Sequence, residues 1–231
     1  MGPGDAFEGF RQEMELLWKG NSEVLKSIRR DVKRRWSFLK RRIVQPARPR
    51  NPDGQVLLHI GCGPVNSPEF VNVDAVPYAH VHIVTDDIGQ LSDFGNGTVD
   101  FVYMCHVLEH IKRPMLERVL GEMHRIINTG GVLRLSVPDF DRLLEVYTKA
   151  GGDTDAICNQ LMGGQDSEYN IHYSIFNQQS LSVLLQKVGF STVRPWDPWN
   201  CRHHDFKDKA CKVMKVNDDR IPISLNLEAV K

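Results

Sequence analysis

Two short apolar runs constrain the fold of this chain most. The first leads into two glycines, and the second ends in an acid. The first run covers residues 56–60 and leads into Gly61-Cys62-Gly63, and the second covers residues 71–73 and ends at Asp74. Glycines let the backbone approach a ligand closely, and an acid at the tip of the next strand accepts hydrogen bonds from ribose hydroxyls. The pattern therefore predicts a nucleoside site at the carboxyl edge of a parallel sheet.

Apolar runs alternate with helical patterns over most of the chain, which predicts a parallel sheet with crossover helices. We expect strands at 56–60, 71–74, 81–84, 101–104, 132–137, 191–196 and 222–230, and helices at about 113–128, 139–149 and 178–188. Asp74 follows Gly61 by only thirteen positions, and Pro64 and Pro68 lie between them. A full crossover helix needs more room, so we expect this first helix to be reduced to about one turn.

Charge is balanced overall but unevenly distributed, with 29 Lys and Arg against 29 Asp and Glu. Residues 26–50 hold eleven basic residues and a single acid, Asp31, whereas residues 51–231 hold sixteen basic and twenty-three acidic residues. We place a domain boundary near residue 50, between a basic amphipathic helical arm (1–50) and the main domain (51–231). An acidic main domain argues against a nucleic-acid partner.

The helical stripe of the arm has two interpretations, which the sequence leaves open. A basic amphipathic helix over residues 22–44 can lie on an anionic membrane surface, at about 1 kcal/mol per basic residue near that surface. It can equally pack its apolar stripe on the main domain or on a second copy of the chain. The expected partner of the arm is therefore either the inner face of a membrane or a protein surface, on the main domain or on a second copy of the chain.

Five cysteines are scattered along the chain without a Cys-x-x-Cys pair, which fits a reducing compartment. No apolar run reaches the roughly 18 residues that span a bilayer, and the first residues lack a signal-peptide core. We therefore expect a cytoplasmic protein. Cys201, His203, His204 and Cys211 match no zinc-finger spacing, so no metal site is expected.

Further segments complete a recognisable series along residues 55–230. They are His59–Gly63, Val71–Asp74, Cys105–Ile111, Asn128–Arg134, Val137–Asp139, Ile171–Phe176 and Ile223–Ala229. With them the sequence resembles the class I S-adenosylmethionine-dependent methyltransferases, and more narrowly the small bacterial methyltransferases of polysaccharide and cell-surface glycan biosynthesis. The resemblance implies a Rossmann-like sheet of seven strands, mostly parallel with an antiparallel last strand. It also implies S-adenosylmethionine as cofactor and O-methylation of a sugar or glycan-related acceptor.

The resemblance also implies which residues bind the cofactor. Gly61, Cys62 and Gly63 would approach its methionine part, and Asp74 would accept from both ribose hydroxyls. Asp86, or else its neighbour Asp87, would meet the adenine amine. Cys105, after the fourth strand, would line the cofactor. Two departures from the wider family, His59 in place of an acid and Val65 in place of a third glycine, put the contacts to the amino group in doubt.

Two histidines are candidate bases for an acceptor hydroxyl, because imidazole titrates near neutral pH. His106 follows the fourth strand, and His172 lies in a polar, glycine-bearing segment that would form a substrate lid. Their alternative roles are packing for His106 and loop anchoring for His172. We expect His110 to be structural and Asp139 to cap a helix.

Two other classes of protein compete with this interpretation. A binding or scaffold protein could keep the fold without the chemistry and use the arm to hold a partner or membrane. A nicotinamide oxidoreductase is disfavoured, because the chain has no Tyr-x-x-x-Lys proton relay.

Overall fold

The structure is a computed structural model that describes residues 32, 46–49, 51 and 53–231. The chain divides into two units, residues 1–46 with 77–80 and residues 47–76 with 81–231. In the first unit the rings of Tyr78 and His80 are stacked, with centroids 5.7 Å apart. The expected helix and contacts of the arm over residues 22–44 lie almost entirely outside the described residues and stay predictions. Nowhere in the described part is a helix both long and apolar enough to cross a bilayer.

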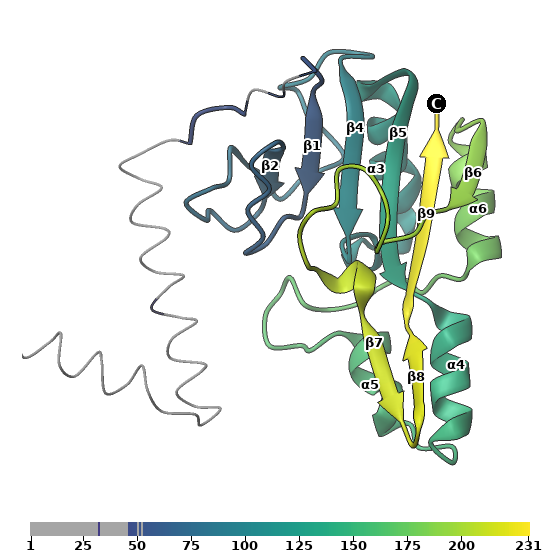
Figure 1. Ribbon diagram of the computed structural model, residues 1–231. Coiled ribbons are helices and arrows are strands. Elements are labelled where there is room, and N and C mark those ends of the chain that lie inside the picture. Colours follow the sequence, from purple (N-terminus) through teal and green to yellow (C-terminus); the bar gives the residue numbers. More distant parts are fainter. Residues whose placement is uncertain (1–31, 33–45, 50, 52) are drawn as a thin grey trace, which may run out of the picture. The chain divides into compact units, whose positions relative to one another are not determined.

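The second unit is built on a seven-stranded sheet with the order β3-β2-β1-β4-β5-β9-β6 (Figure 1). All neighbours pair in parallel except β9, which runs antiparallel to both β5 and β6. The strands are β1 (Leu57–Ile60), β2 (Val71–Asp74), β3 (Ile83–Val84), β4 (Val99–Cys105), β5 (Ile127–Pro138), β6 (Thr192–Pro195) and β9 (Ser224–Val230). This order and the antiparallel β9 confirm the predicted Rossmann-like methyltransferase sheet.

The helices follow the predicted pattern with small shifts in their ends. They are α3 (Leu116–Ile126), α4 (Phe140–Lys149), α5 (Asp155–Met162) and α6 (Gln178–Lys187), with the short 3-10 helices η1 (Leu108–His110), η2 (Arg113–Met115) and η3 (Lys209–Cys211). Asp139 caps α4, as predicted, by accepting the amide of Asp141 at 3.1 Å. Helix α5 and the antiparallel hairpin of β7 (Val213–Val216) and β8 (Asp219–Pro222) were not predicted from the sequence.

The connection from β1 to β2 contains turns but no helix, over the fully described residues 61–70. The prediction of a reduced first crossover is therefore confirmed, and the reduction is complete. A parallel crossover normally needs a dozen or more residues with a helix, and this one has too few. Residues at the end of β1 therefore meet the end of β2 through a tight loop.

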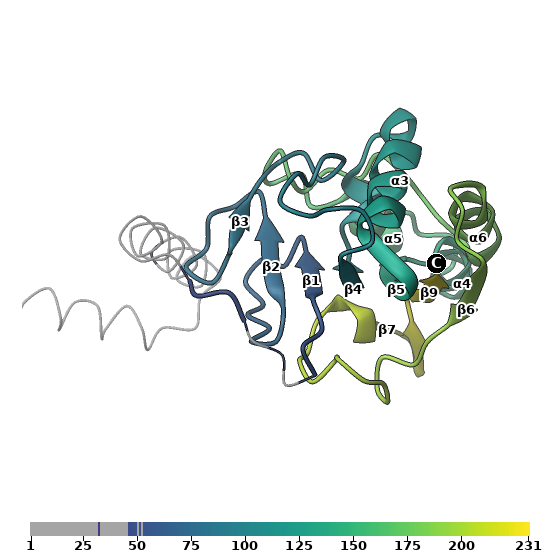
Figure 2. The same cartoon turned by 90° about the horizontal axis from the view of Figure 1, so that it is seen from above.

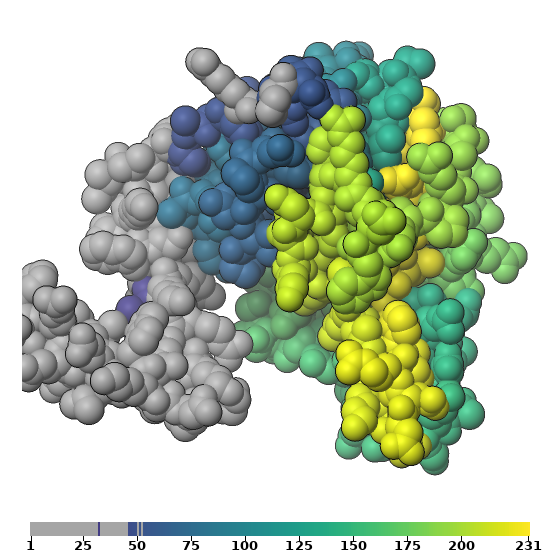
Figure 3. All heavy atoms as spheres, viewed as in Figure 1, coloured from purple at the N-terminus to yellow at the C-terminus, as the bar shows by residue number. Residues whose placement is uncertain are grey.

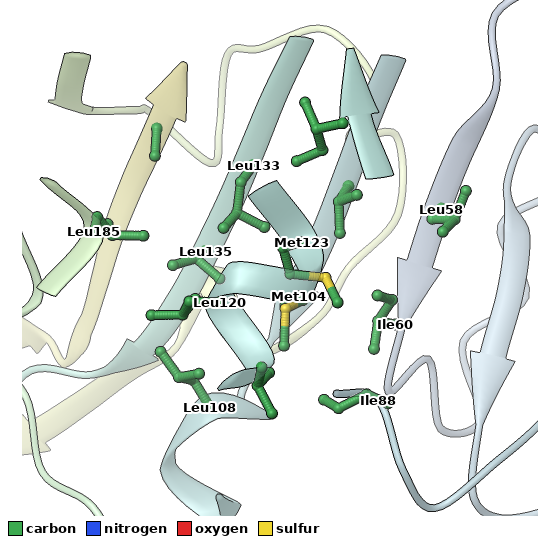
Figure 4. Packing of buried hydrophobic residues seen from close by; sticks show 14 of the residues in the cluster. Leu58, Ile60, Ile88, Met104, Leu108, Leu120, Met123, Leu133, Leu135 and Leu185 are labelled. Carbon is green, nitrogen blue, oxygen red and sulfur yellow. The ribbon is translucent and has the colours of Figure 1, made fainter. Parts of the chain in front are cut away.

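Side chains alternate along the strands between the two faces of the sheet. One face forms the larger hydrophobic core with α3 and α6, and its fully buried members include Leu58, Ile60, Met104, Leu120, Met123, Leu135 and Leu185 (Figure 4). Seen from above, α3 lies on one side of the row of strands and the yellow-green segment 196–211 lies on the other (Figure 2). The helices thus cover one face of the sheet.

The opposite face is covered by the irregular segment 196–211 (Figure 3). Leu57, Phe70, Phe101, Tyr103, Trp196 and Ala210 form its core. The Arg134 guanidinium lies 4.8 Å from the ring centroid of Phe101 and 4.7 Å from that of Trp196. It donates to Glu228 at 2.7 Å, so a buried ion pair stands within this aromatic layer.

A third, smaller core lies beyond the carboxyl ends of β4 and β5. It joins α4, α5 and the hairpin, which extend past the strand ends in Figure 1, through Leu143, Val146, Ile157, Ile221 and Ile223. From α5 the chain returns to α6 through residues 163–177, here called the strap. The carboxyl edge of the sheet is thereby bordered by η1, the strap and the hairpin.

Candidate functional site

The glycine turn and the acid of the second strand meet at the carboxyl edge of the sheet. Ile60 pairs with Val73, so Gly61 lies beside Asp74. The amides of Gly61 and Cys62 donate to the Val73 carbonyl at 2.8 and 3.3 Å. The structure therefore brings together the predicted cofactor residues of β1 and β2.

Asp74 organises this turn through both carboxylate oxygens. Oδ2 accepts the amide of Gly63 at 2.7 Å, and Oδ1 accepts the amide of Val76 at 2.7 Å. Each carboxylate oxygen has a second lone pair. The half-buried side chain therefore holds the loop and keeps acceptor capacity for two hydroxyl groups, which fits a ribose diol.

The positions of Gly61 and Gly63 favour a glycine for different reasons. A Cβ at Gly61 would lie 2.3 Å from Cγ2 of Val107, and Gly61 also has a φ of +65°. A Cβ at Gly63, where φ is +53°, would meet none of the described residues within 4 Å. Gly61 thus permits a close approach of the chain after β4, whereas no described residue crowds the Cβ position of Gly63. Between them, burial first and the charge of Asp74 second raise the pKa of the Cys62 thiol, so Cys62 contributes a neutral packed side chain.

The neighbouring acids after β3 have different surroundings. Asp87 binds Arg118 at 2.6 Å and accepts the amide of Gly89 at 3.0 Å. Within the described residues the carboxylate of Asp86 makes no such bond. The pKa of the Tyr169 phenol is raised by the Glu168 charge, by burial and by the charges of Asp86 and Asp74. Tyr169 of the strap is therefore within electrostatic range of both predicted cofactor acids.

Cys105 and His106 end β4 and point to different surroundings. Burial raises the pKa of the Cys105 thiol well above its ordinary value, and the thiol packs against the aromatic core beside Tyr103 and Asp208. Its assignment as a cofactor contact stays a prediction. His106 has a left-handed φ of +53° and is 9% exposed. Non-glycine residues in this conformation are often held at functional sites.

The side chain of Glu109 is buried among three histidines. It is 1% exposed, and its Oε1 lies 3.1 Å from His106 Nδ1 and 4.0 Å from His172 Nε2. The ring centroids of His110 and His172 are 4.7 Å apart. Burial opposes ionisation of Glu109, yet the proximity of His106 and then of His110 lowers its pKa, so it carries a negative charge. The two predicted bases are therefore gathered around one carboxylate.

Sequence reasoning missed the role of Glu109. A signal was present, because Glu109 lies three residues after His106 and directly before His110 on the chain. An acid between histidines at the end of a strand is a candidate site residue wherever it is buried. The proximity of His172 to Glu109 could not be predicted from the sequence, because 63 positions separate the two residues.

A family model described as a methyltransferase domain matches residues 28–194, more than half of the chain. The chain belongs to this methyltransferase family. No curated protein matches it significantly. A solved S-adenosylmethionine-dependent methyltransferase from Archaeoglobus fulgidus is similar, with 15% identity, 77% of this chain and 86% of that chain covered, and a TM-score of 0.48.

Two further solved structures are similar to this methyltransferase. A possible histamine N-methyltransferase from Thermotoga maritima has 17% identity, with 90% and 96% of the two chains covered and a TM-score of 0.48. The Burkholderia thailandensis 1,6-didemethyltoxoflavin-N1-methyltransferase, solved with that compound and S-adenosylhomocysteine, has 15% identity, 100% and 91% coverage, and a TM-score of 0.46.

The strap of this methyltransferase is fastened to η1 by its backbone. The amides of Tyr173 and Ser174 both donate to the Glu109 carbonyl, at 2.8 and 3.1 Å. His172 Nδ1 lies 2.9 Å from the Gln160 carbonyl, so the ring anchors the strap to α5 as well as facing Glu109. A Cβ at Gly163 would lie 2.4 Å from the Asn170 carbonyl oxygen, which explains the glycine there.

The second group of cysteines and histidines does not converge. His204 lies between the Pro198 carbonyl and Asp208, at 2.9 and 3.2 Å, and the Cys211 thiol contacts Pro198. These residues belong to segment 196–211 and pack against the aromatic core. In the described chain the three-residue group with donor atoms close enough for a metal is Glu109, His110 and His172.

Proposed function

We propose that this chain is an S-adenosylmethionine-dependent methyltransferase that methylates a hydroxyl group of a sugar or glycan-related acceptor. The observation that carries the proposal is the turn at the ends of β1 and β2, in which Asp74 binds the Gly63 amide at 2.7 Å, in a chain of the methyltransferase family. The turn supplies glycine backbone and a carboxylate with free lone pairs, as a nucleoside requires.

The residues around the turn suit the parts of the cofactor, which when bound supplies an electrophilic methyl group on a sulfonium. No described residue crowds the Cβ position of Gly63, and Asp74 retains acceptor positions for the ribose. Asp86 is free of the ion pair that engages Asp87. Tyr169 adds an aromatic ring, 49% exposed, on the strap near these acids.

A hydroxyl acceptor needs a group that takes its proton, whereas an amine can react from its neutral form. His172 Nδ1 faces a carbonyl, which only accepts, so Nδ1 carries hydrogen and Nε2 of the neutral ring has the lone pair. Burial lowers the pKa of His172, which keeps that ring neutral near pH 7. Glu109 stabilises positive charge that forms on His172 or His106. This arrangement supports an oxygen acceptor.

Calorimetric titration of the full chain with S-adenosylmethionine tests the cofactor. Saturable binding is expected, and no binding would favour the scaffold alternative. Labelled methyl donor, incubated with cell-envelope glycan and lipid extracts, then tests the acceptor. Label on sugar oxygen is expected, and label found only on nitrogen would contradict the hydroxyl assignment. His106→Ala and His172→Ala should lower turnover more than cofactor affinity.

A further inference from the structure

Three side chains outside the cofactor turn converge at the carboxyl edge of β4. Glu109 and His110 come from η1, and His172 comes from the strap. One donor atom from each lies within 4.8 Å of the other two. We propose that these residues bind a divalent transition-metal ion such as Zn²⁺, although the sequence led us to expect no metal.

The hydrogen bonds of the two histidines leave Nε2 of each ring as an acceptor. Nδ1 of His110 lies 3.1 Å from the Ile171 carbonyl, and Nδ1 of His172 lies 2.9 Å from the Gln160 carbonyl. Because a carbonyl cannot donate, each Nδ1 carries the hydrogen, and Nε2 of each neutral ring keeps a lone pair. Metal-binding histidines are held in this way, with the other ring nitrogen donating to a backbone carbonyl or a carboxylate.

Glu109 has few donors for a buried carboxylate, and the nearest is the His106 ring. It is 1% exposed, and neither of its oxygens accepts an aligned hydrogen bond. His172 Nε2 is 4.0 Å from Oε1, and His106 Nδ1 is nearer, at 3.1 Å, but is not aligned as a hydrogen bond. A buried charge is normally paired or coordinates a metal. A carboxylate and two imidazole donor atoms within 4.8 Å of one another make a site for a cation.

His106 defines the competing explanation. Ser224 Oγ donates to the Lys209 carbonyl at 2.7 Å, so it accepts from His106 Nε2, 3.0 Å away. Nε2 of His106 therefore carries hydrogen, and Nδ1 faces Glu109 Oε1 at 3.1 Å. The competing explanation is that His106 alone offsets the Glu109 carboxylate, without a metal. With a metal bound, His106 would instead lie beside the Glu109 carboxylate on the side away from the metal.

The donor set indicates the class of ion. Imidazole suits Zn²⁺ and its first-row neighbours, whereas Mg²⁺ and Ca²⁺ prefer oxygen ligands. Two histidines and a glutamate are also a donor set of zinc sites that keep an open position. In a tetrahedral site two metal–ligand bonds of about 2.0–2.2 Å place their ligand atoms roughly 3.4 Å apart, so a donor pair at the widest separation of 4.8 Å must draw in by about 1.4 Å.

The role of the metal rests on the proposed function, although the site itself does not. A metal with an open position holds a hydroxyl and lowers its pKa, so the acceptor loses its proton more easily. His172 would then act as a ligand instead of a base. If the chain binds metal but not S-adenosylmethionine, the proposed metal site is supported and the proposed methyl transfer is refuted.

The test uses the full chain, stripped with a chelator and titrated calorimetrically with ZnCl₂ and, separately, with MgCl₂. One equivalent of Zn²⁺ is expected with a dissociation constant in the micromolar range or below, and no binding of Mg²⁺ in that range. Glu109→Gln and His172→Ala should each weaken Zn²⁺ binding at least tenfold. The matched control is His203→Ala, which removes another histidine with a carboxylate nearby, Glu69 at 3.6 Å, and should leave binding unchanged.

Co²⁺ added to the wild-type chain gives a second readout that needs no variant. Visible absorption typical of four- or five-coordinate Co²⁺ with nitrogen and oxygen ligands is expected, and Zn²⁺ should abolish it. Absence of Zn²⁺ binding by the wild type would overturn the site and assign the charge balance to His106. Unchanged binding in folded Glu109→Gln and His172→Ala chains, or loss in His203→Ala, would also overturn it.

Discussion

The Asp74 carboxylate accepts the backbone amide of Gly63 at 2.7 Å, across a loop that contains no helix. The same side chain therefore folds the turn and offers its remaining lone pairs to a ligand. Replacement of Asp74 by Ala should weaken S-adenosylmethionine binding by about 3 kcal/mol, roughly a hundredfold, because charge-assisted hydrogen bonds are lost. Calorimetry measures the dissociation constant, and wild-type affinity in this variant would refute the ribose assignment.

Asp86 and Asp87 offer a matched pair for the adenine contact. Asp86→Asn should weaken cofactor binding by about 1 kcal/mol, because the acceptor for the exocyclic amine loses its charge. Asp87→Asn should leave the affinity unchanged, since that carboxylate is engaged by Arg118 at 2.6 Å. Calorimetric dissociation constants for both variants decide between them, and the reverse order would move the adenine contact to Asp87.

Gly61→Ala should destabilise the fold by several kcal/mol. The added Cβ would lie 2.3 Å from Val107 and would sit on a backbone with φ of +65°. Overpacking costs roughly 1–3 kcal/mol, and a left-handed conformation adds about 1–2 kcal/mol. Gly63→Ala carries only the second cost, because its Cβ would meet none of the described residues within 4 Å. Urea unfolding of the two variants should show the larger loss at position 61, and equal losses would contradict the steric argument.

Arg134→Ala should lower the free energy of unfolding by about 3–5 kcal/mol, because it leaves the buried Glu228 without its partner. The control is Arg194→Ala. Arg194 also contacts Glu228, at 3.2 Å, but its side chain is 60% exposed. An exposed pair contributes about 0–1 kcal/mol, so this variant should be close to wild type. Denaturant unfolding measures both, and a similar cost for the two arginines would mean that burial does not set the strength of the pair.

Lowering the pH should remove the contribution of Asp208 to the free energy of unfolding. Burial raises its pKa, but hydrogen bonds from His204, Tyr103 and the Ala210 amide outweigh burial, so the pKa lies below its usual value. A depressed pKa stabilises the fold above the unfolded value of about 3.9, and the stabilisation disappears as pH falls through the folded pKa.

The variant Asp208→Asn isolates this contribution. The difference in unfolding free energy between wild type and Asp208→Asn should be constant from pH 6 to about pH 5 and should shrink below about pH 4. Urea unfolding at stepped pH values measures it. A difference that grows on acidification would show that Asp208 is protonated in the folded chain.

The sequence predicted those parts of the fold in which local pattern and burial agree. Continuous buried runs such as Leu57–Ile60 placed the sheet correctly, and the short Gly61–Asp74 interval predicted the loss of the first crossover helix. The hairpin of β7 and β8 was missed because its short strands mix apolar and charged residues. Its turn gave a weak signal, Asn217 before Asp218, and Asn217 indeed has a left-handed φ of 53°.

The candidate site likewise has one part that the sequence predicted and one part that it did not. Asp74 and Gly61 lie at strand ends that pair directly, so their proximity follows from the predicted order of strands. Glu109 and His172 meet because the strap returns from α5 to the end of β4. That route depends on long-range packing of α4, α5 and the hairpin, which no local pattern in the sequence encodes.

Segment 196–211 has an irregular backbone, yet Trp196 and Ala210 are core residues and Phe206 packs against them. Surface loops generally tolerate insertions and proteolytic nicking. Here a cut or an inserted tag would open the layer that shields Arg134 and Tyr103 from water. For anyone engineering this enzyme, the longest irregular stretch after α6 is therefore a poor place for a graft, and it should resist proteases as long as the sheet stays folded.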